Sequence, residues 1–197
     1  ANRKPVYVDC NAVSPPTMRG NAEVVAATGA AFVAAAIIGP PPKPGSTNTK
    51  IYVSGPAARD VLRLNEHGLI VRLLHGPLTA ASALKMSYAG ITKGFTALAA
   101  AMMLAATRDD AADALKAELA ESQPAMTQWL DRQMPNMYGK AYRWVAELDE
   151  IGSFVGEEFP EHAMLIAAAR FYQRIADDYA GKKDEVALLE SFRKPKV

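Results

Sequence analysis

The chain opens with short apolar runs separated by segments of helical periodicity. Continuous or alternating apolar residues predict four strands, at residues 5–9, 31–38, 50–54 and 69–74. Apolar residues three and four positions apart predict two helices between them, at residues 17–28 and 57–66. Because strands and helices alternate, this part of the chain is predicted to form an α/β layer.

The hydrophobic pattern changes at Gly76-Pro77. Residues 79–107 are rich in Ala, Leu and Met, and they predict one helix of about 43 Å at 1.5 Å per residue. Helical periodicity continues in later segments, at residues 110–121, 125–132, 138–155 and 162–180, with a last short helix and a frayed end within 181–197. Pro135 is expected to separate two of these helices. We therefore predict an α/β domain over residues 1–77 and an all-α domain over 78–197.

The composition is that of a globular chain with near-neutral charge. Half of the 197 residues are hydrophobic, and 22 Lys and Arg balance 21 Asp and Glu. This balance lacks the basic excess of nucleic-acid and membrane-surface binders. The longest apolar stretch, residues 94–106, is too short to span a bilayer and predicts a buried helix. The single cysteine, Cys10, excludes an internal disulfide. We expect a cytoplasmic protein without a nucleic-acid or membrane partner.

The α/β part lacks the motifs by which such layers bind nucleotides. It contains no Gly-x-Gly-x-x-Gly turn and no Walker-type lysine loop. It is also only about half as long as a typical doubly wound domain of ~150 residues. We therefore interpret it as the second half of such a domain. An exposed edge of a parallel sheet is a liability, so we expect either an upstream segment or a partner to cover the edge of the first strand. The chain does not begin with Met, and it is therefore expected to be processed, trimmed or incomplete.

Polar residues that follow the first predicted strand are the first candidate for chemistry. Asp9, Asn11 and Ser14 stand at the carboxyl end of that strand, where α/β sheets bind their ligands. The alternative is a plain strand end, with Ser14 as the N-cap of a helix that begins with Pro15-Pro16. The spacing leaves both interpretations open.

Lys85 is the second candidate, because it is the only charge between Leu78 and Thr92. A lysine in such a segment either extends its ammonium to the surface or lies in a cleft. A third segment, residues 142–150, interleaves aromatic and acidic side chains and predicts a packed helix with a solvated acidic face. The three histidines show no metal-ligand spacing, so no metal site is predicted.

Three segments together resemble the β-hydroxyacid dehydrogenases, the family that includes 3-hydroxyisobutyrate and 6-phosphogluconate dehydrogenases. Residues 8–15, Val-Asp-Cys-Asn-Ala-Val-Ser-Pro, are similar to the family's substrate segment. Residues 32–39 resemble the strand that leads into its Ser-Gly-Gly loop, and residues 79–86 lie where its interdomain helix begins. The resemblance is strongest to the branch with a phosphogluconate-dehydrogenase-like C-terminal domain. It implies the second half of a Rossmann-like domain, a long interdomain helix and a helical C-terminal domain.

The resemblance also implies a function, namely NAD- or NADP-dependent oxidation or reduction of a small hydroxy acid. Lys85 falls on the family's catalytic lysine and would act as general acid and base. Asn11 and Ser14 would bind substrate, Asn11 would also contact the cofactor, and the backbone at Gly39 would approach a carboxylate. The chain departs from the family pattern at Ala89, which replaces an asparagine, and in losing the serine of the Ser-Gly-Gly loop. The late lysine near the nicotinamide is replaced within the acidic residues 147–150.

Two other functions remain open. In the first alternative, the chain is a non-catalytic helical ligand-binding module that lacks the cofactor half. In the second, it is an enzyme that resembles imine reductases, which often lack the lysine. In each case we expect a homodimer. The reason is that the apolar face of residues 98–106 exceeds what one small helical domain readily buries.

Overall fold

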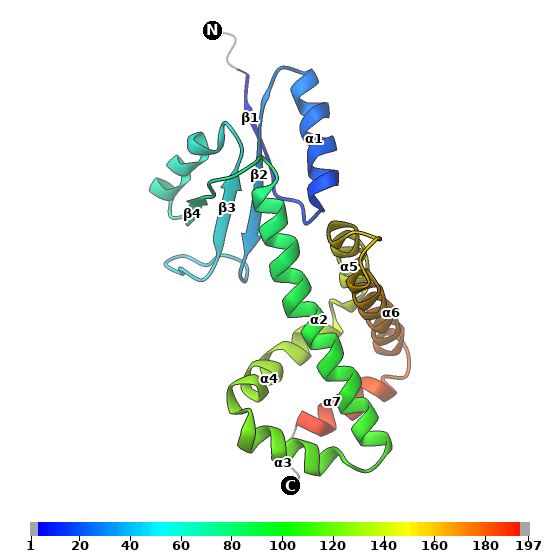
Figure 1. Ribbon diagram of the computed structural model, residues 1–197. Helices are drawn as coiled ribbons and strands as arrows, with labels where there is room; N and C mark the ends of the chain where they lie inside the picture. The colour runs from blue at the N-terminus through cyan, green and yellow to red at the C-terminus, as the bar shows by residue number, and fades with distance from the viewer. Residues whose placement is uncertain (1–3, 194–197) are drawn as a thin grey trace. The chain divides into compact units, whose positions relative to one another are not determined.

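The computed structural model describes residues 4–193 and consists of two compact units, Ala1–Ala89 and Gly90–Val197 (Figure 1). We call them the α/β unit and the helical unit. The predicted boundary near residue 77 lies at the start of the long helix, whereas the two units divide inside it. The first turns of that helix therefore belong to the α/β unit.

A mixed sheet of four strands forms the centre of the α/β unit. Its strands, in spatial and sequence order, are β1 Val6–Asp9, β2 Ala31–Ile38, β3 Lys50–Ser54 and β4 Val71–Leu73. The pairs β1–β2 and β3–β4 are parallel, and β2–β3 is antiparallel. The loop of residues 39–49 returns the chain directly beside β2, as in a hairpin, and this makes the central pair antiparallel. The predicted bounds of β2 and β3 are confirmed.

The apolar run of β2 is buried on both faces of the sheet. Helix α1, Pro15–Ala27, contributes Met18 and Ala22 to a cluster with Phe32, Ala34 and Ala36 on one face. The 3-10 helix η1, Ala58–His67, contributes Ala58 and Val61 to the cluster on the other face, which contains the remaining buried residues Val33, Ala35, Val53 and Val71. Successive residues of a strand point to opposite faces, so a doubly covered strand must be apolar throughout.

The long predicted helix is confirmed as α2, Ala80–Arg108. Its start is tied to β3 by Ser54, whose Oγ donates to the carbonyl of Leu78 (2.6 Å) and accepts from the backbone N–H of Ala81 (2.9 Å). This buried hydroxyl supplies a partner for one of the orphan N–H groups of the first helical turn. By length and composition alone α2 is also long and apolar enough to cross a membrane, a test that core helices of water-soluble proteins pass as well.

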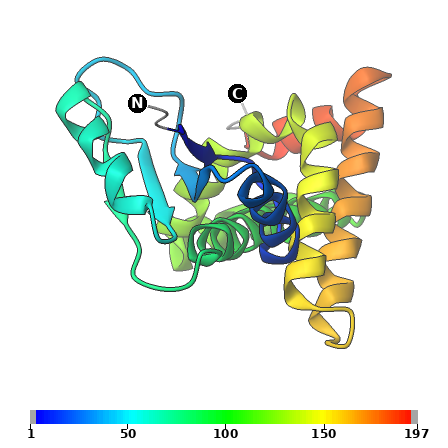
Figure 2. The same ribbon diagram turned by 90° about the horizontal axis from the view of Figure 1, so that it is seen from above.

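Between Gly90 and Arg193, the described part of the helical unit, the chain forms the rest of α2 and five further helices. These are α3 Ala112–Ser122, α4 Pro124–Tyr138, α5 Ala141–Val155, α6 Glu161–Ala180 and α7 Asp184–Arg193. Figure 2 shows α5 and α6 side by side, in yellow and orange, and they form the most extensive helix pair of the unit. The core has aliphatic, methionine and tyrosine side chains, among them Leu104, Met134, Met137, Leu148, Ile151, Tyr172, Ile175 and Leu189. The predicted frayed end beyond Arg193 lies outside the described residues.

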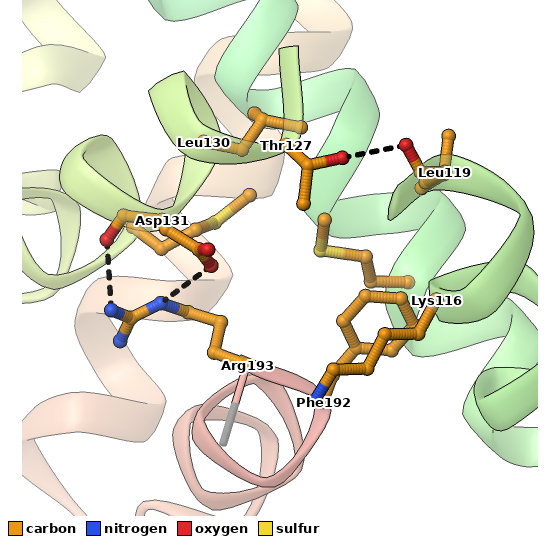
Figure 3. A pocket seen from close by; sticks show the side chains of 9 residues that line it. Lys116, Leu119, Thr127, Leu130, Asp131, Phe192 and Arg193 are labelled. Carbon is orange, nitrogen blue, oxygen red and sulfur yellow. Dashed lines mark hydrogen bonds and ion pairs between the residues drawn. The ribbon is translucent and has the colours of Figure 1, made fainter. Parts of the chain in front are cut away.

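The predicted end of α4 is wrong. The helix was expected to stop at Arg132, before Pro135, but it continues through the proline to Tyr138. A proline inside a helix removes the hydrogen bond to the carbonyl four residues earlier, here that of Asp131. Arg193 of α7 fills this gap, because its Nη2 donates to the Asp131 carbonyl at 2.8 Å (Figure 3). The helix therefore tolerates Pro135 through a contact that is distant in sequence.

Candidate functional site

Asp9 organises the polar residues at the carboxyl end of β1. Its side chain is buried, and Oδ1 accepts hydrogen bonds from the backbone N–H of Asn11 (2.9 Å) and from Asn11 Nδ2 (2.8 Å). Its Oδ2 accepts from Asn21 Nδ2 of α1 at 3.0 Å. A buried carboxylate needs such partners. The result is that Asn11, which is exposed, is held in one orientation at the end of the strand.

Ser14 serves as the N-cap of α1. Ser14 is buried. Its Oγ lies 2.9 Å from Thr17 Oγ1 and accepts a hydrogen bond from the Thr17 backbone N–H at 3.5 Å. This is the capping interpretation that the sequence left open, and it occupies the hydroxyl that substrate binding would require. Cys10 follows Asp9 and is exposed as a residue. The pKa of its thiol is raised, mainly because neighbouring atoms cover part of the thiol and to a smaller extent because of the negative charge of Asp9.

Lys85 lies at the carboxyl end of β2. It is on the second turn of α2, and its Nζ donates a hydrogen bond to the carbonyl of Ile37 at 2.8 Å. Ile37 is the last residue but one of β2 and precedes Gly39 by two positions. The structure therefore brings the ammonium of Lys85 to the same strand end as Gly39.

The first turns of α2 also contact the loop that follows β1. Ser82, one turn before Lys85, donates its hydroxyl to the carbonyl of Val13. Because β1 and β2 are parallel, both of their carboxyl ends lie at one edge of the sheet. Consecutive turns of α2 thus connect the loop of residues 10–14 with the end of β2. This edge, formed by residues 10–14, residues 37–39 and the Ser82–Lys85 turn, is what we call the strand-end site.

Gly39 is required by the backbone at this edge. Its φ is +125°, and a Cβ on it would lie 2.9 Å from the Cα of Thr49 and closer still to the carbonyl oxygen of Asn48. Only glycine adopts this conformation without strain, and here it permits the close return of residues 48–49. The need for glycine at this position is therefore explained by the turn itself.

The turn between β1 and α1 does not provide a pyrophosphate cradle. A dinucleotide phosphate is normally bound by backbone N–H groups of a glycine-rich turn and a helix N-terminus. The β1–α1 loop, residues 10–14, contains no glycine. The first two residues of α1 are Pro15 and Pro16, which have no backbone N–H to donate. Within residues 4–193, this strand–helix turn therefore does not fit the dinucleotide.

Residues 142–150 lie on α5, and Leu148 belongs to the helical core, but the predicted solvated acidic face is wrong at Glu147 and the predicted packed aromatic face is wrong at Tyr142, which is exposed. Glu147 forms a largely buried ion pair with Lys93 of α2. The Nζ atom of Lys93 also lies 5.5 Å from the ring centre of Trp144. Tyr172 of α6 donates its hydroxyl to the carbonyl of Lys93 at 2.6 Å, and burial raises its pKa so that it keeps this proton. The sequence indicated that Lys93 shares a face with Lys85, but it contained no signal for the pairing with Glu147.

The cavity drawn in Figure 3 is too small for a substrate. It is lined by α3, α4, α7 and Met103, and its volume of about 30 Å³ has room for roughly one water molecule. Thr127 and the Asp131–Arg193 pair face it, and both are already engaged with neighbouring helices. We regard it as a packing gap between helices. The strand-end site remains the candidate functional site.

The comparisons with known proteins concern both units. Residues 106–175 match the model of a domain of unknown function, DUF1932. No curated protein matches the chain at a significant level. A solved structure of the conserved protein MTH1747, of unknown function, is described as revealing structural similarity with 3-hydroxyacid dehydrogenases. It is 26% identical to this chain and covers 88% of it, with a TM-score of 0.67.

A second solved structure is that of a conserved hypothetical protein from Sinorhizobium meliloti 1021. It is 24% identical, covers 95% of this chain and has a TM-score of 0.72. The chain spans 66% of the length of each of these two proteins. The predicted order, an α/β part followed by an all-α part, is confirmed. Residues 106–175 are therefore similar to the DUF1932 domain model, and the chain has the fold of the solved protein MTH1747, whose structure is described as similar to 3-hydroxyacid dehydrogenases.

Proposed function

We propose that this chain supplies the substrate-binding and proton-transferring part of an NAD- or NADP-dependent oxidoreductase that acts on a small hydroxy acid. One observation carries the proposal. The ammonium of Lys85 lies at the carboxyl end of β2, within hydrogen-bond distance of the Ile37 carbonyl, at the sheet edge where α/β proteins bind ligands. The similarity of a related structure to 3-hydroxyacid dehydrogenases supports the same reaction class.

Lys85 has the chemistry that this reaction requires of a protein side chain. Oxidation of a hydroxy acid removes the proton of the alcohol O–H, and reduction of the keto acid returns a proton to that oxygen. A lysine amine accepts the proton in the first direction, and its ammonium donates it in the second. The ammonium also attracts the carboxylate of the substrate. The hydride belongs to nicotinamide chemistry, and only substrate binding and proton transfer are assigned to these residues.

Asn11 is the second residue that we assign to the substrate. It is exposed at the end of β1, and Asp9 holds both its backbone N–H and its side-chain amide. A polar group fixed in this way binds a ligand without a further loss of side-chain entropy. Ser14 is a weaker candidate, because its hydroxyl caps α1. The backbone at Gly39, two residues after the Ile37 carbonyl that Lys85 contacts, is the third group that we assign to the substrate, for close approach to its carboxylate.

A second function, that of a non-catalytic hydroxy-acid-binding module, has one observation in its favour. The β1–α1 turn has no glycine, and α1 begins with Pro15-Pro16, so this turn offers a dinucleotide no phosphate cradle. Under this alternative the strand-end site binds the acid but turns nothing over. An activity like that of imine reductases is disfavoured by the position of Lys85 at the site.

Calorimetry of the 197-residue chain tests the substrate class and the role of Lys85. The ligands are a panel of small 2-hydroxy and 3-hydroxy carboxylic acids. We expect at least one to bind, and Lys85→Met to weaken its affinity by about tenfold or more, since a charge-assisted contact is lost. Lys182→Met, at an exposed position between α6 and α7, removes the same charge elsewhere and should leave the affinity unchanged.

A turnover assay separates the two functions. The complete protein that the proposal implies, this chain together with a dinucleotide-binding half, is incubated with the bound acid and either NAD⁺ or NADP⁺, and reduced cofactor is followed by its absorbance. Turnover that Lys85→Met abolishes supports the oxidoreductase. Binding of the acid without turnover by either cofactor favours the binding module. If no hydroxy acid binds, or if Lys85→Met binds as tightly as the natural chain, both proposals are wrong.

A further inference from the structure

Ser82 of α2 uses its hydroxyl differently from three other hydroxyl residues in the helices. Thr96, Thr107 and Ser122 each donate to the carbonyl four residues earlier in their own helix. Ser and Thr inside helices commonly form this bond. Ser82 is 1% exposed, and its Oγ donates instead to the carbonyl of Val13, 69 positions away in the sequence. Its hydroxyl therefore joins α2 to the loop that follows β1.

The carbonyl that Ser82 would contact within its own chain segment is already engaged. Four residues before Ser82 stands Leu78, whose carbonyl accepts a hydrogen bond from Ser54 Oγ at 2.6 Å. Serine is also a weaker helix former than alanine, and alanines occupy the positions on either side of Ser82. The helix itself would thus be served better by alanine at this position. The contact with Val13 explains the serine where helix formation does not.

The contact between Ser82 and Val13 connects the two side chains that we assign to the substrate. Lys85 lies one turn after Ser82 on the same side of α2, because residues three positions apart are neighbours on a helix surface. Asn11 lies two residues before Val13, and Asp9 fixes it through two hydrogen bonds. The path from Lys85 to Asn11 therefore consists of one helical turn, one hydrogen bond and a short piece of loop.

Both ends of this path are held by further contacts inside the α/β unit. At the helix end, the Nζ of Lys85 donates to the carbonyl of Ile37 at 2.8 Å. At the loop end, the side chain of Val13 packs against the cluster that includes Met18 of α1 and Ala81 of α2. A hydrogen bond between two segments that are already packed loses little conformational entropy when it forms. The loop and the first turns of α2 are therefore fixed relative to each other.

We propose that Ser82 is a positioning residue that sets the separation between Asn11 and Lys85, and thereby the spacing of hydroxyl and carboxylate that the strand-end site accepts. This inference rests on the proposed function, in which both side chains contact one hydroxy acid. The hydroxyl of a 3-hydroxy acid is one carbon further from the carboxylate than that of a 2-hydroxy acid. Two contacts at a fixed separation match one of these spacings, and a mismatch of one carbon costs about tenfold or more in affinity.

Two positional isomers, 2-hydroxybutanoate and 3-hydroxybutanoate, measure this selectivity, because they have the same mass and charge. Each is titrated into the 197-residue chain, and binding is followed by amide NMR. We expect the natural chain to bind one isomer about tenfold or more tightly than the other, and Ser82→Ala to reduce this ratio to about threefold or less. Ser82→Thr keeps the hydroxyl and should keep the ratio. The matched control is Ser87→Ala, at an exposed position of α2, which should leave the ratio unchanged.

Amide hydrogen exchange tests the same link without a ligand. The probe is the backbone N–H of Asn11, which donates to Asp9 inside the linked loop. Because the loop loses one anchor in Ser82→Ala, we expect this amide to exchange about fivefold or more faster than in the natural chain or in Ser87→Ala. A serine with only a structural role would change exchange and melting temperature but not the isomer ratio.

The outcomes separate this inference from the proposed function. If one isomer binds and Ser82→Ala keeps the natural ratio, or if Asn11 exchanges equally fast in both chains, the inference is wrong and the proposed function stands. A natural chain that binds both isomers equally, or a Ser82→Thr chain that loses the ratio as Ser82→Ala does, also overturns it. If neither isomer binds, the inference is wrong, and binding of another hydroxy acid decides whether the proposed function stands.

Discussion

At the scale of single residues, Asp9 has a larger structural role than its position at a strand end indicates. Its buried carboxylate accepts three hydrogen bonds, two from Asn11 and one from Asn21. The first two span two residues and follow from a local turn, but the third joins β1 to α1 across twelve positions. The strand-end site is therefore arranged around a charge that itself does not reach the surface.

Removal of this carboxylate should destabilise the α/β unit. Asp9→Ala deletes three acceptor contacts and leaves the donors of Asn11 and Asn21 to water, so we expect the free energy of unfolding in urea to fall by about 2–4 kcal/mol. Asp60→Ala, at an exposed position in η1, is the control and should change it by less than about 0.5 kcal/mol. Equal effects of the two substitutions would contradict the role given to Asp9.

Gly39 and Gly45 provide a matched pair for the shape of the turn after β2. Both have positive φ, +125° and +75°, but a Cβ at Gly39 would collide with the backbone of Asn48 and Thr49, whereas one at Gly45 would meet open space. We expect Gly39→Ala to lower the free energy of unfolding by about 2–3 kcal/mol and Gly45→Ala by about 1 kcal/mol. Thermal unfolding of the two variants measures the difference. A Gly45→Ala variant that is the less stable of the two would disprove this assignment.

At the scale of elements, the local pattern predicted the strands and helices well where local chemistry decides them. The bounds of β2 and β3 follow from apolar runs with turn residues on either side, and the start of α1 follows from Ser14-Pro15-Pro16. The antiparallel sense of β2 and β3 was not predicted, because it depends on how a proline-rich loop returns. The passage of α4 through Pro135 was not predicted either, because its compensation comes from Arg193.

This compensation predicts an energetic coupling between α4 and α7. Arg193→Met should lower the free energy of unfolding by about 1–2 kcal/mol, since the carbonyl of Asp131 then has neither Pro135 nor Arg193 as donor. In a Pro135→Ala background the restored helical N–H satisfies that carbonyl, so the same substitution should cost less, by about 0.5–1 kcal/mol. A double-mutant cycle in urea measures this coupling. Strictly additive effects would show that Arg193 does not compensate for the proline.

At the scale of the whole molecule, α2 belongs to both units and carries residues that matter in each. Its first turns contribute Ser82 and Lys85 to the strand-end site, and its later turns contribute Met103 and Leu104 to the core of the helical unit. The long helix was evident in the sequence, because residues 79–107 are rich in Ala, Leu and Met. Lys85 was evident because it is the only charge between Leu78 and Thr92. The contacts of Asp9 with Asn21 and of Lys93 with Glu147 were not, because each joins segments that only the fold brings together.

The most direct test of the account is to map where a hydroxy acid binds. Backbone amide NMR spectra of the 197-residue chain are recorded during titration with the hydroxy acid that binds best. We predict that the largest shifts fall on residues 10–14, 37–39 and 82–85, and that Lys85→Met removes them while Lys182→Met does not. Shifts confined to the helical unit, or the same shifts in Lys85→Met, would contradict the assignment of Lys85 and the strand-end site.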